Sequence, residues 1–141
     1  MPIHMPSSEP IKIKIDTEDD IVSVRQRVRS LAQESGFDPF AIAAITTSAS
    51  ELSRNVWRHA TSGMAEIQVL REGERIGLQL EVSDQGPGIA DLQRALAGGY
   101  STVKSLGLGL SGTRRLVDEF HIDTAPGRGT KVTIRKWKRG F

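Results

Sequence analysis

The chain has 141 residues, a formal net charge of +2 at pH 7 and no cysteine. This length fits one domain that buries an apolar core without cross-links, and the lack of cysteine excludes disulfides and thiolate–zinc frameworks. The small net charge does not by itself indicate a nucleic-acid partner. No segment resembles a signal peptide or a membrane-spanning helix. We therefore expect a flexible N-terminal tail over residues 1–10 and a single cytoplasmic domain over residues 11–141, with no membrane partner.

The first half of the chain predicts one strand and two helices. Residues 11–15 alternate strictly between isoleucine and lysine, which is typical of a strand with one buried face. A helix then begins after Asp16 or Thr17 with an acidic first turn, and Gly36 ends it. Asp38–Pro39 supplies the cap and the first-turn proline of a long second helix. The apolar stripe of the first helix consists of Ile21, Val24, Val28 and Leu31.

The second half predicts a hairpin-rich sheet with further helices. Strands grouped after helices and joined by hairpin-length connections indicate an α/β (α+β) two-layer sandwich, with helices on one face of a mixed, mostly antiparallel sheet. The expected strands are residues 64–70, 76–82, 122–125 and 130–137, and the expected helices are residues 91–97 and 108–120, with a loop over residues 98–106 between them.

The C-terminal residues 135–139 form a basic cluster around one aromatic residue, Trp137. A nucleic-acid contact and a solvated chain end after the last strand are the two interpretations. The small net charge favours the solvated end, so we expect no nucleic-acid partner.

The second helix carries the clearest candidate residues. At about 100° per residue, its apolar residues fall within one stripe that must face the sheet: Ile42, Ile45, Ala49, Leu52 and Val56. Glu51, Asn55 and His59 lie along the rim of that stripe, where residues four apart are neighbours.

A carboxylate and an amide on the rim of a core suggest proton transfer and metal binding. A partly desolvated Glu51 is a better proton acceptor at neutral pH, and the Asn55 amide oxygen suits Mg²⁺ beside water and phosphate oxygens. The alternative is a solvated helix face on which Glu51 pairs with Arg54.

The segment Asp84–Gly88 follows a predicted strand. Gly86 and Gly88 allow the chain to turn and a flat ring to approach the backbone. A carboxylate fixed at Asp84 would accept a hydrogen bond from the exocyclic amine of adenine and would reject guanine. The alternative is an ordinary turn with aspartate at its first position.

The segment Gly107–Leu108–Gly109–Leu110 directly precedes a predicted helix. Backbone N–H groups at such a helix start, approachable because glycine lacks a side chain, form an anion site. The alternative is a glycine-rich hinge. Upstream, residues 98–105 are small and polar and suit a lid. Lys104 within them would either neutralise γ-phosphate charge or be an ordinary solvated lysine.

Four segments in this order are similar to the N, G1, G2 and G3 boxes of the GHKL ATPase and kinase superfamily, which includes gyrase, MutL and the histidine kinases. They are Glu51–Asn55, Asp84–Gly88, Gly107–Leu110 and Gly127–Thr130. The short single domain resembles the branch of anti-sigma factors and serine-protein kinases, above all the switch kinases of the bacterial stressosome. The similarity runs from about Ile11 to Trp137. It implies the Bergerat ATP-binding fold, with ATP and Mg²⁺ as cofactors.

The resemblance also implies a role for each matching residue. Glu51 matches the catalytic base, Asn55 the Mg²⁺ ligand, Asp84 the adenine reader and Thr130 the hydroxyl beside the adenine. His59 stands at a variable position and is expected only to line the pocket. The glycine matches are Gly86 and Gly88 in the G1 turn and Gly107 and Gly109 in the phosphate loop, where Leu108 and Leu110 accompany them.

Three functions remain after the resemblance. The first is a protein serine/threonine kinase that phosphorylates STAS-domain scaffold or antagonist proteins (RsbS- and RsbR-like). The second is an anti-sigma factor that directly sequesters a sigma subunit, whose relatives imply a homodimer. The third is a nucleotide-dependent binding module that switches an output protein such as a phosphatase or cyclase. The presence of both Glu51 and Asn55 favours the kinase, and a released kinase can also bind an output protein.

Overall fold

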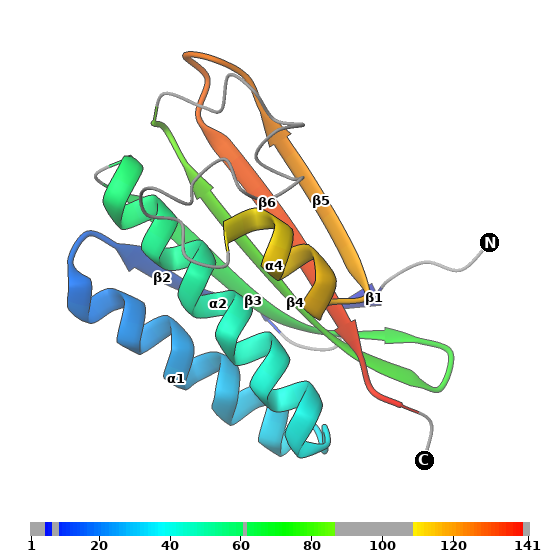
Figure 1. Ribbon diagram of the computed structural model, residues 1–141. Helices are drawn as coiled ribbons and strands as arrows, with labels where there is room; N and C mark the ends of the chain where they lie inside the picture. The colour runs from blue at the N-terminus through cyan, green and yellow to red at the C-terminus, as the bar shows by residue number, and fades with distance from the viewer. Residues whose placement is uncertain (1–4, 7–8, 61, 87–108, 140–141) are drawn as a thin grey trace.

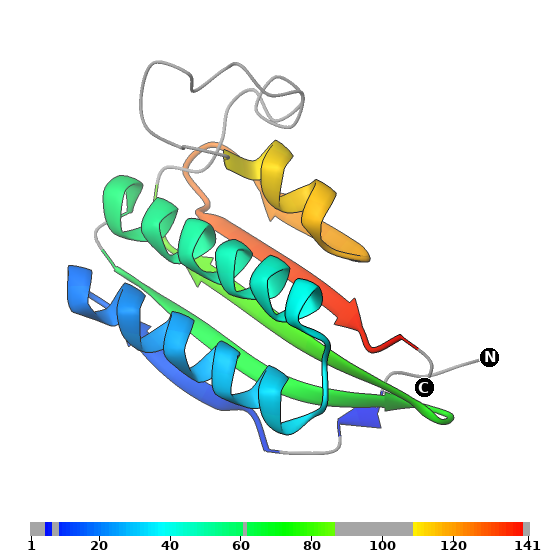
Figure 2. The same cartoon turned by 60° about the horizontal axis from the view of Figure 1, so that its bottom comes forward.

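The computed structural model describes residues 5–6, 9–60, 62–86 and 109–139. In this part of the chain, helices lie against one face of an antiparallel sheet (Figure 1, Figure 2), which confirms the predicted two-layer sandwich. None of these helices is long and apolar enough to cross a membrane. The elements in chain order are β1 (Met5–Pro6), β2 (Ile11–Ile15), α1 (Glu18–Glu34), α2 (Pro39–His59), β3 (Gly63–Glu72), β4 (Arg75–Asp84), α4 (Gly109–Leu116), β5 (Glu119–Thr124) and β6 (Thr130–Trp137).

The described strands all pair in antiparallel fashion, in the order β1-β3-β4-β6-β5, and β2 also pairs with β3. Met5–Pro6 lies opposite Leu70 and Arg71, so two residues of the predicted tail join the sheet. At the other end of the sheet, Asp84 lies opposite Thr130 of β6, and Thr130 lies opposite Thr124 of β5. This register sets the candidate residues Asp84 and Thr130 in one row with Thr124, across three strands.

The two long helices begin where the capping residues predict. The Asp20 carboxylate accepts hydrogen bonds from the backbone N–H groups of Asp16 (2.8 Å) and Thr17 (2.9 Å) at the start of α1. These backbone bonds lower the pKa of Asp20. The Asp38 carboxylate accepts from the Ala41 N–H at 2.9 Å at the start of α2. Gly36, at a φ of +83°, ends the turn after α1, as its sequence position predicts.

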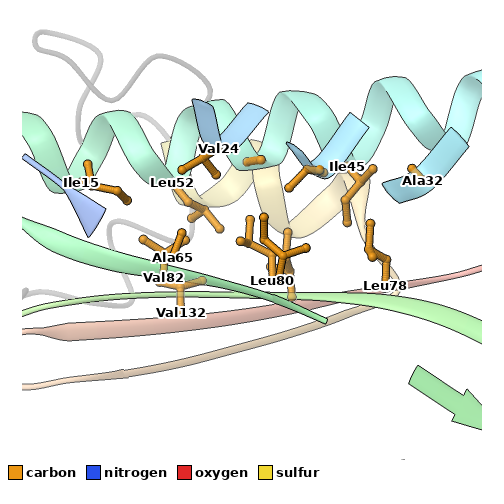
Figure 3. Packing of buried hydrophobic residues seen from close by; sticks show 14 of the residues in the cluster. Ile15, Val24, Ala32, Ile45, Leu52, Ala65, Leu78, Leu80, Val82 and Val132 are labelled. Carbon is orange, nitrogen blue, oxygen red and sulfur yellow. The ribbon is translucent and has the colours of Figure 1, made fainter. Parts of the chain in front are cut away.

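The core lies between the helices and the sheet (Figure 3). Helix α2 lies in the middle of the helical layer and packs against both α1 and α4. Its side chains Ile45 and Leu52 point toward Leu80 and Val82 of β4 (Figure 3). Burial of this stripe fixes the rotation of α2 about its axis, and hence the position of every residue on its rim.

The third main helix is shorter than its sequence predicts. Helix α4 ends at Leu116, and Phe120 belongs to β5 opposite Ile134, so the predicted extension to Phe120 is wrong. Two contacts with β6 explain the stop. Lys136 Nζ donates to the Leu116 carbonyl at 3.2 Å, and the Asp118 carboxylate accepts from the Trp137 N–H at 2.7 Å. The predicted helix at residues 91–97 and the loop at 98–106 lie outside the described residues.

The face of the sheet without helices holds a small cluster of its own around Trp137. Lys136 reaches α4, so Trp137, the next residue in the strand, points to the opposite face. Its ring is 5% exposed, donates from Nε1 to Glu119 at 2.6 Å and lies 4.2 Å from the Arg75 guanidinium. Arg135 bonds Gln79 and Glu119. Three residues of the basic cluster, 135–137, are therefore engaged within the fold, which weakens the nucleic-acid interpretation.

Gly77 is required where this ring crosses β4. A Cβ atom at Gly77 would lie 2.6 Å from Trp137 Cε3. We expect Gly77→Ala to lower the free energy of unfolding by about 1–3 kcal/mol through overpacking, measured by urea denaturation. In a Trp137→Leu background the same substitution should cost clearly less, because the smaller side chain leaves room. An equal cost in both backgrounds would contradict this packing.

Candidate functional site

The candidate residues gather at one end of the molecule. The C-terminal end of α2, the end of β4, the start of α4 and the turn between β5 and β6 all lie there (Figure 1, Figure 2). A Cβ atom at Gly86 would lie 2.6 Å from Ala60 Cβ, so the G1 turn contacts the residue that ends α2. The fold thus places the N-box helix directly beside the turn after β4.

The Glu51 carboxylate has two oxygens in different surroundings. Oε2 accepts a hydrogen bond from Arg54 Nη1 at 2.8 Å, one turn along α2. Oε1 is buried and has no hydrogen-bond partner among the residues that the structure describes. The pairing with Arg54 therefore exists, but the side chain is only 13% exposed, so it does not lie on a solvated helix face as the alternative had it.

Asn55 presents a second unpaired oxygen on the same helix. Its Oδ1 atom is buried and without a hydrogen-bond partner within the described residues. Buried polar atoms are nearly always paired, so two such oxygens four residues apart on the rim are candidate contacts for a ligand, an ion or water. An amide oxygen suits Mg²⁺, which keeps phosphate and water oxygens as its other ligands. Within the described ranges, no group of three or more His, Cys, Asp or Glu side chains could hold a metal by itself.

Asp84 ends β4 and fixes the turn that follows. Its Oδ1 atom accepts from the Gly86 N–H at 2.8 Å, which is the turn geometry typical of aspartate. The carboxylate is therefore held in place, and its second oxygen is the atom that an adenine amine would use. The turn interpretation and the adenine-reader interpretation are thus compatible in one residue.

Thr130 lies beside Asp84 with its hydroxyl oriented by Thr124. Thr124 Oγ1 donates to the Gly129 carbonyl at 3.0 Å, and the two threonine hydroxyls lie 2.9 Å apart. A hydroxyl has one proton to donate, so Thr130 donates to Thr124 and keeps its lone pairs as acceptors. Thr130 and Asp84 together thus offer acceptors at the end of the sheet.

Gly129 allows β4 and the β5–β6 turn to meet. Its φ is +81°, and a Cβ atom there would lie 2.2 Å from the Asp84 carbonyl oxygen. No other residue fits both the backbone conformation and this approach. The glycine in the G3 box therefore keeps Asp84 and Thr130 close.

A cavity of about 130 Å³ lies at this junction. This volume is below the roughly 300–1,000 Å³ typical of small-molecule sites, so it can accommodate only part of a nucleotide. Glu51 and Asn55 do not line it. Its walls include Asp84, Gln85, Thr124, Arg128, Thr130 and Lys131.

His59 connects the α2 rim electrostatically to Asp84. Partial burial lowers the pKa of His59, and the Arg58 charge lowers it further, whereas the Asp84 carboxylate raises it. The neutral imidazole suits a pocket wall, which is the role the sequence predicts for this residue.

The G2 segment is described only in part. Gly109 begins α4 with a φ of +62°, which favours glycine, and Gly109 and Leu110 are both buried. Gly109 is the first described residue of α4, one residue after the predicted start of this helix. The remaining predicted site residues, Gly88, Lys104, Gly107 and Leu108, and the predicted lid at residues 98–105 lie outside the described residues.

Two residues of the site were not predicted. Thr124 orients the Thr130 hydroxyl, and only the register of the β5–β6 hairpin reveals this. Arg54 was predicted only as part of an alternative in which Glu51 has no chemical role, yet the structure places its guanidinium on Glu51 within the site. The i, i+3 spacing of the two residues was the available signal.

Comparisons with known proteins show the family to which the chain belongs. A family model described as the histidine kinase-like ATPase domain matches residues 15–136. The chain is 42% identical over 127 residues to the serine/threonine-protein kinase RsbT of Bacillus subtilis (strain 168), covering 90% of this chain and 96% of that protein. It is 30% identical over 102 residues to an anti-sigma F factor of Thermoanaerobacter sp. (strain X514), covering 68% of this chain and 70% of that protein.

Solved structures support the fold alone, because their identities are low. The structure of the RsbU and RsbW domains of Rv1364c from Mycobacterium tuberculosis gives a TM-score of 0.66 at 23% identity over 94% of this chain and 34% of that longer chain. The SiaB–SiaC complex from Pseudomonas aeruginosa gives a TM-score of 0.52 at 11% identity over 92% of this chain and 89% of the matched chain.

The chain belongs to the histidine kinase-like ATPase family, whose members use ATP, and it has the GHKL-type fold. Within that family it is a protein serine/threonine kinase, on the strength of its similarity to RsbT over nearly the whole length of both proteins.

The electrostatic interaction between His59 and Asp84 predicts a measurable pKa change. Asp84→Asn removes the charge that raises the pKa of His59, so this pKa should fall further below its ordinary value. An NMR titration of the His59 imidazole measures it. Asp123→Asn, which removes a carboxylate from the β5 side of the cavity, is the charge control and should leave the pKa of His59 in place. An unchanged pKa of His59 in the Asp84→Asn variant would contradict an electrostatic interaction between Asp84 and His59.

Proposed function

We propose that this kinase acts in a bacterial partner-switching pathway of the stressosome type. It phosphorylates a serine or threonine hydroxyl on STAS-domain scaffold or antagonist proteins of the RsbS and RsbR type. Once released from them, it binds a downstream output protein such as a phosphatase or cyclase. The similarity to RsbT over 96% of that protein's length supports the proposal.

The observation that carries the catalytic proposal is that Glu51 Oε1 and Asn55 Oδ1, two of the four buried, unpaired side-chain oxygens of α2 among the described residues, lie four residues apart on the rim of the helix. Each would cost about 1–3 kcal/mol if it stayed unpaired in every state of the protein. A site that binds a metal–nucleotide complex and an acceptor hydroxyl pairs both of them.

Each residue then has one role. Glu51 Oε1 would accept the proton of the acceptor hydroxyl, and Asn55 Oδ1 would hold the Mg²⁺ ion that accompanies ATP. Asp84 and Thr130 accept hydrogen bonds at the adenine edge, and Gly109 brings backbone N–H groups close to phosphate. When bound, ATP would supply the phosphoryl group, whose bond to ADP breaks as the acceptor oxygen bonds to phosphorus.

A sequestering anti-sigma factor is the second candidate, because the chain is 30% identical to anti-sigma F factors over 68% of its length. Such a protein would hold its partner as its main activity, and phosphate transfer would be slow. The kinase and the anti-sigma factor predict different effects of a substitution at Glu51: the kinase would lose its effect on the pathway, whereas the anti-sigma factor would still inhibit its partner.

Substitutions at Glu51 and Asn55 should impair different steps, phosphate transfer in the first case and nucleotide binding in the second. Glu51→Gln keeps the shape and removes proton acceptance, so Mg·ATP should still bind while phosphate transfer falls by about 10²–10⁴-fold. Asn55→Ala removes a metal ligand, so nucleotide binding itself should weaken. Transfer of radiolabelled phosphate to a STAS-domain protein, run beside calorimetric binding of Mg·ATP, measures both.

Glu66→Gln, on β3, is the matched control for loss of a carboxylate and should behave as wild type. Wild-type transfer by Glu51→Gln would remove the proposed catalytic role. Full partner binding and pathway inhibition by a transfer-deficient Glu51→Gln would favour the anti-sigma candidate.

Nucleotide choice should depend on Asp84. The wild-type protein should bind ATP more tightly than GTP, because guanine presents an oxygen where adenine presents an amine to the carboxylate. Loss of this buried hydrogen bond should cost about 1–3 kcal/mol, so Asp84→Asn should bring the ATP and GTP affinities measured by calorimetry close together. Equal affinities in the wild-type protein would refute this role of Asp84.

A further inference from the structure

Arg54 fixes one half of the Glu51 carboxylate. Its Nη1 atom donates to Glu51 Oε2 at 2.8 Å, a length typical of a charge-assisted bond. The Glu51 side chain is 13% exposed and that of Arg54 is 33% exposed, so the ion pair is largely removed from solvent on the side of Glu51. The other oxygen, Oε1, is buried and unpaired among the described residues.

The helix that carries this pair is rigidly placed. Leu52 and Val56 lie in the core, and Ser53 is fully buried beside them. A guanidinium and a carboxylate three residues apart are neighbours on the surface of such a helix. Since a partly exposed ion pair of this kind contributes only about 0–1 kcal/mol to stability, its larger effect is on the orientation of the carboxylate.

We propose that Arg54 is a positioning residue for phosphate transfer, an inference that rests on the proposed catalytic role of Glu51. By holding Oε2, Arg54 prevents the carboxylate from rotating and keeps Oε1 directed to the acceptor hydroxyl. The hydroxyl proton passes to Oε1 while the acceptor oxygen bonds to phosphorus and the bond to ADP breaks. Arg54 takes no proton, because a guanidinium has no acceptor site.

The inference predicts a loss of rate without a loss of nucleotide affinity. Arg54→Met should lower single-turnover phosphate transfer to a STAS-domain protein by about 10- to 100-fold through misplacement of the base, while calorimetric affinity for Mg·ATP stays at the wild-type value. Arg54→Lys should recover part of the rate, because an ammonium can hold one oxygen without the fork geometry. Arg71→Met, an exposed arginine near the β3–β4 turn at the opposite end of β4 from Asp84, is the charge control and should transfer at the wild-type rate.

A double-mutant cycle separates positioning from general damage. In a Glu51→Gln background, Arg54→Met should have no further effect on the transfer rate, because there is no base left to position. The same fold-loss in both backgrounds would overturn the inference, as would a faster Arg54→Met enzyme. If Glu51→Gln is slow and Arg54→Met transfers at the wild-type rate, only the role of Arg54 fails. If Glu51→Gln itself transfers at the wild-type rate, the proposed function fails.

Discussion

The burial of one face of α2 is the constraint on which the site depends. Ile45 and Leu52 pack between α1, α4 and the sheet, so the helix cannot rotate. Glu51 and Asn55 are thereby held on the rim of the core, where each keeps a buried, unpaired oxygen within the described structure. Unpaired buried oxygens destabilise a fold, so each of them calls for an explanation, and the proposed nucleotide site supplies one for Glu51 and Asn55.

The second half of the site depends on close backbone approach. Gly129 lets the β5–β6 turn meet the end of β4, and this meeting places Thr130 beside Asp84. Gly86 in turn contacts Ala60 at the end of α2. The end of β4 that carries Asp84 and the helix that carries Glu51 are therefore joined by contacts that only glycine permits. The Asp84 carboxylate also raises the pKa of His59 on that helix.

The sequence predicts the parts of this fold that depend on local patterns. The caps at Thr17 and Asp38 and the strand at residues 11–15 follow from neighbouring residues, and so does the rim position of Glu51 and Asn55. The end of α4 could not be predicted, because it is set by Lys136 and Trp137 on a strand about twenty residues away. Thr124 was missed for a related reason, and the pairing of Arg54 with Glu51 was considered only for a solvated helix face. Spacing along the helix shows which side chains can form a hydrogen bond. Only the folded structure shows that the bond from Arg54 uses Oε2 of Glu51 and leaves Oε1 unpaired among the described residues.

The most direct test of the account is a crystal structure of the protein with Mg²⁺ and a non-hydrolysable ATP analogue. The account predicts Asn55 Oδ1 within about 2.1 Å of the ion, the adenine amine on Asp84, and Glu51 Oε1 facing the γ-phosphate with Oε2 still held by Arg54. A nucleotide bound with Asn55 Oδ1 and Glu51 Oε1 both unpaired and remote from the phosphates would contradict it.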